Sequence, residues 1–144
     1  MHGTLVCAVT DGAENDDAVA QAAALSERLG LRLVLAHVVD GIATLGNDGD
    51  ESITMKSDRK VAERGLEELA RDHDLDDSAW RRVAIGDPAT ILGQIASEEA
   101  ADVIVVGARA RRWRRHNLES RLARELESET PVPVLIAPPR KRQR

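Results

Sequence analysis

Five arginines lie close together in the segment VVGARARRWRRHNLESR, which covers residues 105–121. They are Arg109, Arg111, Arg112, Arg114 and Arg115. Guanidinium groups donate forked, charge-assisted hydrogen bonds that match phosphate and carboxylate oxygens. The run follows an apolar stretch that ends at Gly107, which is how a phosphate-binding turn begins. The segment therefore indicates a surface that contacts an anion or a protein partner.

Two other interpretations of the arginine run stay open. The arginines could form a solvated loop that balances an acidic surface or pairs with carboxylates of a second subunit. Together with Trp113 they also resemble a nucleic-acid footprint, in which cations hold phosphates and an aromatic ring stacks on a base. The charge of the rest of the chain makes nucleic acid the less favoured partner.

Charge is divided unevenly along the sequence. The 144 residues carry 20 basic and 25 acidic side chains, a formal net charge of −5. The arginine run and the last five residues, RKRQR, hold nine of the basic residues and no acid, so the remainder has 11 basic against 25 acidic residues. A body with this excess of acids repels a polyanion.

No catalytic or metal-binding pattern is present in the sequence. It lacks the elbow G-x-S-x-G, the loop G-x-x-x-x-G-K-[ST], the fingerprint G-x-G-x-x-G and the CxxC motif. The four histidines are not spaced as metal ligands. Cys7, the single cysteine, lies in an apolar run and is expected to be packed inside a strand. We therefore expect a binding protein rather than an enzyme, with no metal and no internal disulfide.

Apolar runs and helical patterns alternate along the chain. The runs, which are expected to be buried strands, cover residues 5–10, 31–39, 81–85, 102–107 and 132–137. Helices are expected after residue 14, around 61–69, from 87 and from 118. The clearest helix start is Asp87 as N-cap with Pro88 as the first helical residue. Trp80 is expected to close the core beside the third strand.

The alternation predicts one α/β domain with a parallel sheet between two layers of helices. The polar, glycine-rich residues from about 40 to 52 are expected to be a long loop, and residues 139–144 a basic, disordered tail. No apolar stretch reaches the roughly 18 residues of a membrane span, and no secretory signal is apparent. We therefore expect a cytoplasmic protein that does not bind membranes.

Three segments, in this order, resemble the universal stress protein (UspA) family. They are LVCAVTDGAENDDAVAQAAALSERLGLRLVLAHVVD, GDPATILGQIASEEAADVIVVGAR and PVPVLIA. The resemblance covers residues 1–138 and implies a three-layer α/β/α domain of the adenine nucleotide alpha hydrolase-like type, with a five-stranded parallel sheet of order 3-2-1-4-5. It also implies a stress-response or regulatory role. Ligands of such sheets bind beyond the carboxyl ends of the strands, where the strand order reverses.

The resemblance also assigns candidate nucleotide contacts. Nucleotide-binding members carry a Gly, two residues, a second Gly, nine residues, and then Gly followed by Ser or Thr. Those four positions are Gly107, Ala110, Ser120 and Arg121 in this sequence. Only the first is kept. The other candidates are Asp11 at the ribose, Val38 at the base, the flanking positions Val9 and Val106, and Arg109 through its guanidinium.

The missing glycines make the usual ATP site unfavourable. Glycine lets main-chain N–H groups approach a phosphate, whereas a non-glycine residue in the left-handed conformation costs about 1–2 kcal/mol and its side chain fills space. Arg121 also replaces a short hydroxyl side chain with a long cation. We therefore expect no cofactor. ATP with Mg²⁺, bound by a sensor or weak ATPase, is the alternative.

The last apolar run predicts an interface. As the final strand it would lie at an edge of the sheet, where prolines are tolerated and the apolar Val132, Val134 and Ile136 would be uncovered. The family resemblance implies that this strand contacts its copy across a two-fold axis. We therefore expect a homodimer through the last strand, with a further protein partner left open.

Overall fold

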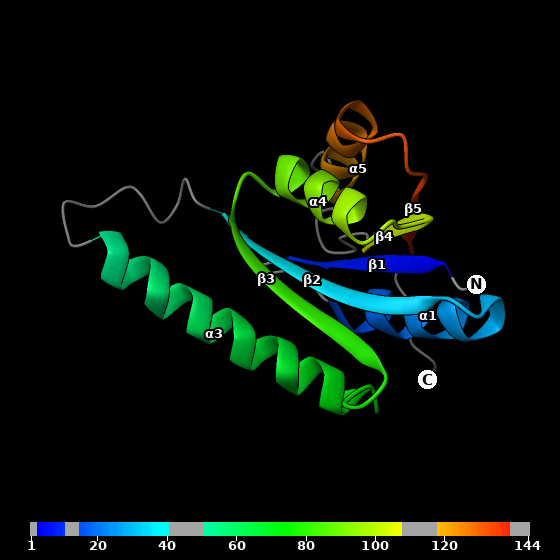
Figure 1. The fold of residues 1–144 in the computed structure, drawn as a ribbon, viewed down its shortest axis with the longest axis horizontal. Helices are drawn as coiled ribbons and strands as arrows, with labels where there is room; N and C mark the ends of the chain where they lie inside the picture. Colours follow the sequence, from blue (N-terminus) through cyan, green and yellow to red (C-terminus); the bar gives the residue numbers. More distant parts are fainter. Residues whose placement is uncertain (1–2, 11–14, 41–50, 108–117, 139–144) are drawn as a thin grey trace, which may run out of the picture.

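The computed structural model describes residues 3–10, 15–40, 51–107 and 118–138 (Figure 1). For residues 40, 51–57 and 118–121 it describes the backbone alone. The predicted tail, residues 139–144, and most of the predicted loop, residues 41–50, therefore lie outside the described residues.

Strands and helices alternate along the described chain. The strands are β1 (Thr4–Val9), β2 (Arg32–Asp40), β3 (Ala79–Gly86), β4 (Val103–Gly107) and β5 (Val134–Ala137). The helices are α1 (Asn15–Leu29), α3 (Glu51–Asp72), α4 (Pro88–Glu98) and α5 (Leu118–Glu129). The helix α3 begins inside the segment that was expected to be a loop.

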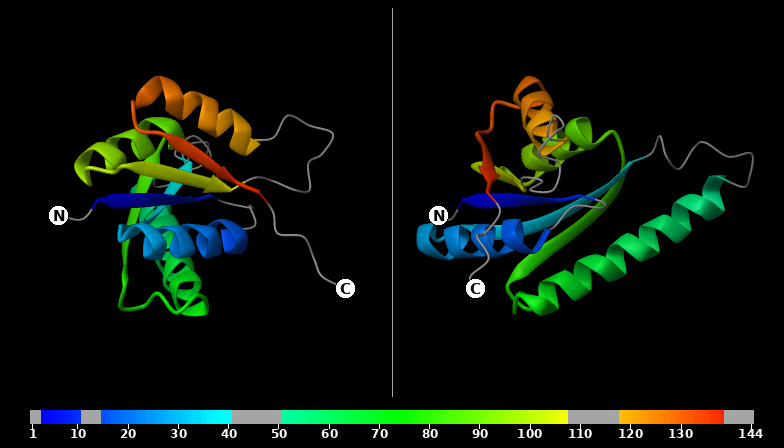
Figure 2. Two further views of the ribbon diagram at one scale, coloured as in Figure 1. Left: turned by 90° about the vertical axis from the view of Figure 1, so that its right-hand side faces the viewer. Right: turned by 180° about the vertical axis from the view of Figure 1, so that it is seen from behind.

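All five strands form one parallel sheet in the order β3-β2-β1-β4-β5. Helices α1 and α3 cover one face of the sheet, and α4 and α5 cover the other (Figure 2). The predicted α/β class and strand order are therefore confirmed. Every residue of β1 is buried, because this strand lies at the centre of the sheet between two helical layers.

Each face of the sheet has its own hydrophobic core. On the α1 and α3 side, side chains such as Leu5, Leu35 and Leu66 are fully buried together. On the α4 and α5 side, residues such as Val34 and Leu92 are buried together in a second core. Successive residues of a strand point to opposite faces, which is why the apolar runs are continuous rather than alternating.

Two strands start at residues other than those predicted. β3 begins at Ala79, two residues before its apolar run, because its backbone already pairs with Leu33 of β2 there. β5 begins at Val134, two residues later than predicted. Pro133 has no N–H to donate, and only its carbonyl oxygen joins the sheet, accepting a hydrogen bond of 2.9 Å from the backbone N–H of Ile104.

The start of α4 follows the prediction. Asp87 has an extended backbone, and its side chain accepts a hydrogen bond of 3.1 Å from the backbone N–H of Thr90. Pro88 takes the first helical position, where its missing N–H costs nothing. Asp87 is therefore the N-cap of α4, and it fixes where this helix leaves the carboxyl end of β3.

Trp80 does not close the core, contrary to the prediction. Its side chain is 61% exposed, and the guanidinium of Arg32 lies over the ring at 5.6 Å from the centroid. The reason is its place in the fold. Trp80 stands near the start of an edge strand, beside Arg32, which also contacts Glu99 at the end of α4, and a residue there meets solvent on its outer side.

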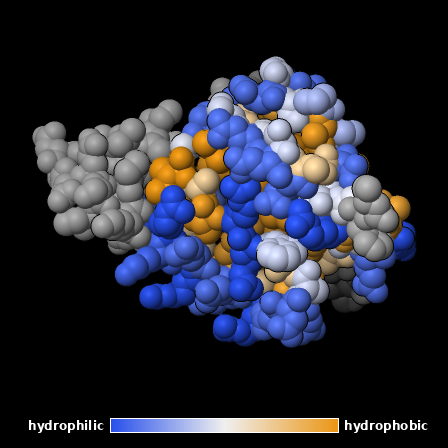
Figure 3. Space-filling view, viewed as in Figure 1, coloured by the Kyte–Doolittle hydropathy of each residue, from blue (hydrophilic) through white to orange (hydrophobic). Residues whose placement is uncertain are grey.

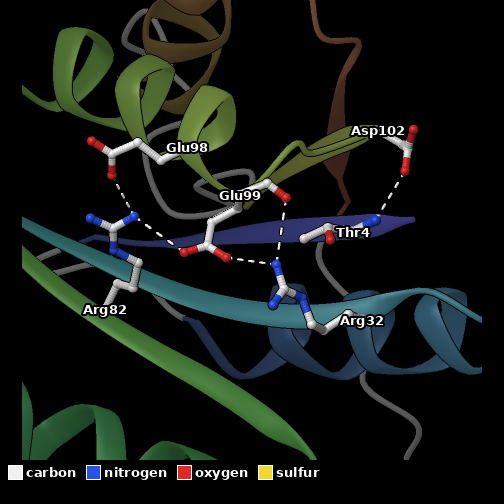
Figure 4. Close-up of polar contacts among 6 residues, drawn as sticks. All are labelled: Thr4, Arg32, Arg82, Glu98, Glu99 and Asp102. Atoms are coloured by element: carbon white, nitrogen blue, oxygen red, sulfur yellow. Dashed lines mark hydrogen bonds and ion pairs between the residues drawn. The ribbon is translucent and has the colours of Figure 1, made fainter. Parts of the chain in front are cut away.

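A charged cluster joins the end of α4 to the two neighbouring strands (Figure 4). The carboxylate of Glu99 contacts Arg32 of β2 at 2.7 Å and Arg82 of β3 at 3.2 Å, and Arg82 also contacts Glu98 at 2.7 Å. Because the carbonyl end of a helix carries partial negative charge, cations placed there are favourable. These ion pairs therefore hold the end of α4 against β2 and β3.

Cys7 is fully buried in β1, as predicted, and burial raises the pKa of its thiol to about 12 from a usual 9.0. The unfolded chain therefore loses this proton at lower pH than the folded chain does. Cys7 contributes stability that is complete below pH 9.0 and is lost as the pH rises towards 12. We expect the free energy of unfolding to fall, through this residue, by about 1.4 kcal/mol per pH unit in that window.

Urea denaturation of the wild type and of Cys7→Ala under reducing conditions tests this prediction. Other titrating groups are common to both proteins, so the difference between their unfolding free energies isolates the thiol. That difference should shrink steadily between pH 9.0 and 11. A difference that does not change with pH would contradict it.

Candidate functional site

The strand order reverses between β1 and β4, at the carboxyl-terminal edge of the sheet. β1 pairs with β2 on one side and with β4 on the other, so the chain leaves these two neighbouring strands in opposite directions. Such a reversal separates the connecting segments and leaves room between them for a ligand. The candidate contacts at Val9 and Gly107, which end β1 and β4, both lie at this reversal.

The start of α1 is fixed to the end of β1 by an amide side chain. The backbone N–H of Thr10 donates to Oδ1 of Asn15 at 3.2 Å, and Nδ2 of Asn15 donates to the carbonyl oxygen of Thr10 at 3.0 Å. These two bonds hold together the ends of the segment that contains Asp11. Asn15 was expected at the start of this helix but not as a clamp, although an amide five residues after Thr10, where the first apolar run ends, is a recognisable signal for one.

Three candidate contacts have side chains that are not available to a ligand. Val9 is buried in the core on the α1 and α3 side, and Val38 and Val106 are buried on the α4 and α5 side. These residues could meet a ligand only through backbone atoms. Val38 adjoins His37, which is partly exposed and pairs in register with Val9 on one side and Val83 on the other.

Gly107 is the last residue of β4 and is partly exposed. Its neighbour in register is Ala137 of β5, so it lies level with the end of that strand. A glycine at this position leaves the backbone uncovered next to the reversal, which suits a close approach by an anion.

The structure leaves the other candidates untested. Asp11 and the candidates of the arginine segment lie outside the described residues; the latter are Arg109, Ala110, Arg111, Arg112, Arg114 and Arg115. Ser120 and Arg121 are described by their backbone alone, which is already helical because α5 begins at Leu118. The two final positions of the glycine motif thus fall within the first turn of α5.

The last strand exposes apolar side chains, although not all of those predicted. Ile136 is 42% exposed, and its neighbour Leu135, which was not predicted, is 48% exposed. Val132 and Val134 are instead partly buried against the core below α4 and α5. A strand two residues shorter than expected shifts the exposed apolar surface towards its carboxyl end.

The fold is an α/β domain with a five-stranded parallel sheet, and its candidate site lies at the switch point of the strand order. The sequence matches the model of the universal stress protein family over residues 1–138. The chain belongs to this family.

Solved structures agree with this assignment. Universal stress protein UspA from Lactobacillus plantarum has a TM-score of 0.73 and 14% identity, over 95% of this chain and 99% of that one. A protein of the family from Burkholderia pseudomallei has a TM-score of 0.62 and 27% identity, over 93% and 96%. The universal stress protein from Archaeoglobus fulgidus in complex with dAMP has a TM-score of 0.60 and 19% identity, over 94% and 97%. No curated protein matches the sequence.

In the part of the chain that the structure describes, none of the helices combines the length and the apolar composition that crossing a membrane requires.

Proposed function

We propose that the protein is a stress-response binding module that acts through contacts with a protein partner and does not hold ATP in the manner of the glycine-motif members of its family. The observation that carries this proposal is the composition of the motif segment. Gly107 is kept, but alanine, serine and arginine stand at the other three positions. Ala110 and Ser120 add side chains where the motif needs bare backbone, and Arg121 puts a long cation in place of a short hydroxyl.

The position of α5 bears on the proposal. Because this helix begins at Leu118, the N–H groups of Ser120 and Arg121 lie in its first turn, where they have no acceptor within the helix and can face an anion. What argues against the motif is therefore the type of residue at these positions, a serine in place of glycine and an arginine in place of a short hydroxyl residue. The arginines could bind an anion through their side chains, but flexible side chains give weaker and less selective binding than a fixed cradle.

An adenine-nucleotide sensor is the second candidate. It is favoured by the relative from Archaeoglobus fulgidus, which is in complex with dAMP, and by Asp11, which follows the strand at the switch point. In this alternative the backbone at Val38 would meet the base and the arginine segment would meet the phosphates. A weak ATPase would need the same binding step, so both belong to one alternative.

Calorimetric titration with ATP, with and without Mg²⁺, separates the two candidates. We expect a Kd weaker than about 100 μM, because the fixed amides that would hold the phosphates are missing. Mass spectrometry of the purified protein should find no stoichiometric nucleotide. Binding at micromolar concentration that Asp11→Ala abolishes would instead establish the sensor. Asp76→Ala, an exposed acid at the opposite edge of the sheet, is the matched control.

We also propose that the protein works in the cytoplasm as a homodimer joined through β5. A single, buried cysteine suits a reducing compartment. Leu135 and Ile136 supply exposed apolar surface on an edge strand, which needs a cover in a soluble protein. The absence of a catalytic motif in the sequence supports a role in binding rather than in catalysis.

A further inference from the structure

The strand β3 forms the free edge of the sheet on the side away from β5. It pairs with β2 alone among the described strands. All eight of its residues are partly or fully exposed, in contrast to the wholly buried β1. Unpaired N–H and C=O groups along such an edge are a template on which another extended segment can add a strand.

A guanidinium shows which backbone groups of β3 face outwards. Nη1 of Arg59, on α3, donates a hydrogen bond of 3.0 Å to the carbonyl oxygen of Val83. In a parallel strand the N–H and C=O of one residue point to the same side, and alternate residues point to opposite sides. Arg81 and Ile85 therefore also present their backbone groups to the free edge. Arg59 therefore already binds one of the outward carbonyl oxygens, that of Val83, which an added strand would use.

A groove runs between this edge and α3. It has a volume of about 290 Å³ and is lined by Glu63, Leu66, Glu67, Arg81 and Val83. Leu66 is buried and forms its floor, whereas both glutamates are exposed. Glu63 and Glu67 stand one helical turn apart, so their carboxylates lie on the same side of α3. Within the described residues neither carboxylate has an ion-pair partner.

The opposite side of β3 offers a different surface. Trp80, Arg82 and Ala84 point to the α4 face of the sheet, where Arg82 is paired with Glu98 and Glu99 and Trp80 is largely exposed. Figure 3, viewed from the direction of Figure 1, shows small hydrophobic areas scattered among hydrophilic ones on this side of the molecule. Exposed tryptophan beside arginine is the composition of an interaction hot spot.

We propose that the free edge of β3 binds an extended peptide segment of a partner protein in which basic and apolar residues alternate. The segment adds a strand to β3 through the outward backbone groups of Arg81, Val83 and Ile85. Its basic side chains point to the α3 side, where they pair with Glu63 and Glu67. Its apolar side chains point to the α4 side and pack on Trp80, since alternate residues of a strand face opposite sides.

Binding of a fluorescein-labelled hexapeptide, Val-Arg repeated three times, measured by anisotropy on the full chain, tests this proposal. The control peptide has three valines followed by three arginines, with the same composition and charge but no alternation. We expect the alternating peptide to bind at least about tenfold more tightly than the control, because only it can place every arginine on one side. Equal binding would overturn the proposal.

Two protein variants examine the two halves of the site. Arg81→Pro removes an outward N–H and leaves the pairing with β2 intact, and Glu63→Gln with Glu67→Gln removes both carboxylates from an exposed helix surface. We expect each variant to bind the alternating peptide about tenfold more weakly than the wild type, or weaker still. Circular dichroism verifies that the variants are folded. If the glutamine variant binds as the wild type does, the charge pairing and the proposal are wrong.

Arg59→Ala should have the opposite effect, because it frees the Val83 carbonyl for the incoming strand. We expect binding several-fold tighter, about the contribution of one hydrogen bond. Arg64→Ala is the matched control, since it removes the same charge from an exposed position on the same helix. Equal tightening by both would mean that charge alone acts, which contradicts strand addition. A molecular mass that falls with Arg81→Pro would assign the edge to contacts between copies and overturn the proposal.

Discussion

A chain that carries Ala110→Gly, Ser120→Gly and Arg121→Ser is expected to bind ATP at least about tenfold more tightly than the wild type. These three changes restore the glycine spacing and the final hydroxyl that nucleotide-binding members of the family carry. The wild-type sequence already supplies Gly107 at the end of β4 and the switch point beside it. The variant therefore asks whether the motif residues alone separate this chain from a nucleotide binder.

The size of the expected effect follows from the backbone. One residue that must enter the left-handed region costs about 1–2 kcal/mol with a Cβ and almost nothing as glycine. Glycine at position 120 also leaves bare backbone in the first turn of α5, so that a phosphate can approach the free N–H groups of this turn. Arg121→Ser adds a short hydroxyl donor in place of a long side chain. Together these terms exceed the 1.4 kcal/mol that corresponds to a tenfold change.

Calorimetric titration of the restored variant with ATP measures the effect. The matched control is Ala108→Gly, which adds a glycine to the same segment at a position that the motif does not use. The control should bind no better than the wild type. If the restored variant also gains nothing, bulk at the motif positions is not what weakens binding, and the interpretation of the motif as degenerate is contradicted.

The parallel sheet and its two helical layers could be predicted because they depend on features that a sequence displays directly. Continuous apolar runs such as residues 5–10 mark strands buried on both faces, and the helical patterns between them require parallel crossovers. The N-cap at Asp87 was equally visible, because its side chain satisfies a hydrogen bond within its own turn. The order 3-2-1-4-5 itself came from the family resemblance.

The exposure of residues at the edges could not be predicted in the same way. Whether Trp80 is covered depends on how far α4 extends over β3, which is a property of packing and not of the local sequence. Val134 and Leu135 are both apolar, and only the register of β5 against β4 decides which is packed against the core. The candidate site shares this difficulty, since the side chains that would meet a ligand come from segments whose conformation is not set by strand or helix periodicity.

The two edges of the sheet differ in chemistry, and this difference suggests different partners. The edge at β3 carries arginines and stands beside two carboxylates, whereas the edge at β5 exposes leucine and isoleucine. A self-complementary contact across a two-fold axis is most easily made by apolar surface, because like charges on the two copies would meet and repel. The β5 edge is therefore the better place for a homodimer, and the β3 edge is left free in that assembly.

Leu135→Asp is expected to convert the proposed homodimer into a folded monomer. In a contact through β5 this residue, 48% exposed in the single chain, would be buried twice, once in each copy. Two unpaired carboxylates in an apolar interface cost several kcal/mol, so the dimer should weaken by more than about 100-fold. The side chain is not part of the buried core of the single chain, so the fold should survive, which the partly buried Val134 would not guarantee.

Light scattering coupled to size-exclusion chromatography measures the molecular mass of the variant, and urea denaturation measures its stability. Leu29→Asp is the matched control, because Leu29 is 60% exposed at the end of α1 and the substitution adds the same charge. The control should keep the mass of the wild type. Loss of the dimer in both variants would point to added negative charge on an already acidic chain. An unchanged dimer in Leu135→Asp would place the interface elsewhere on the molecule.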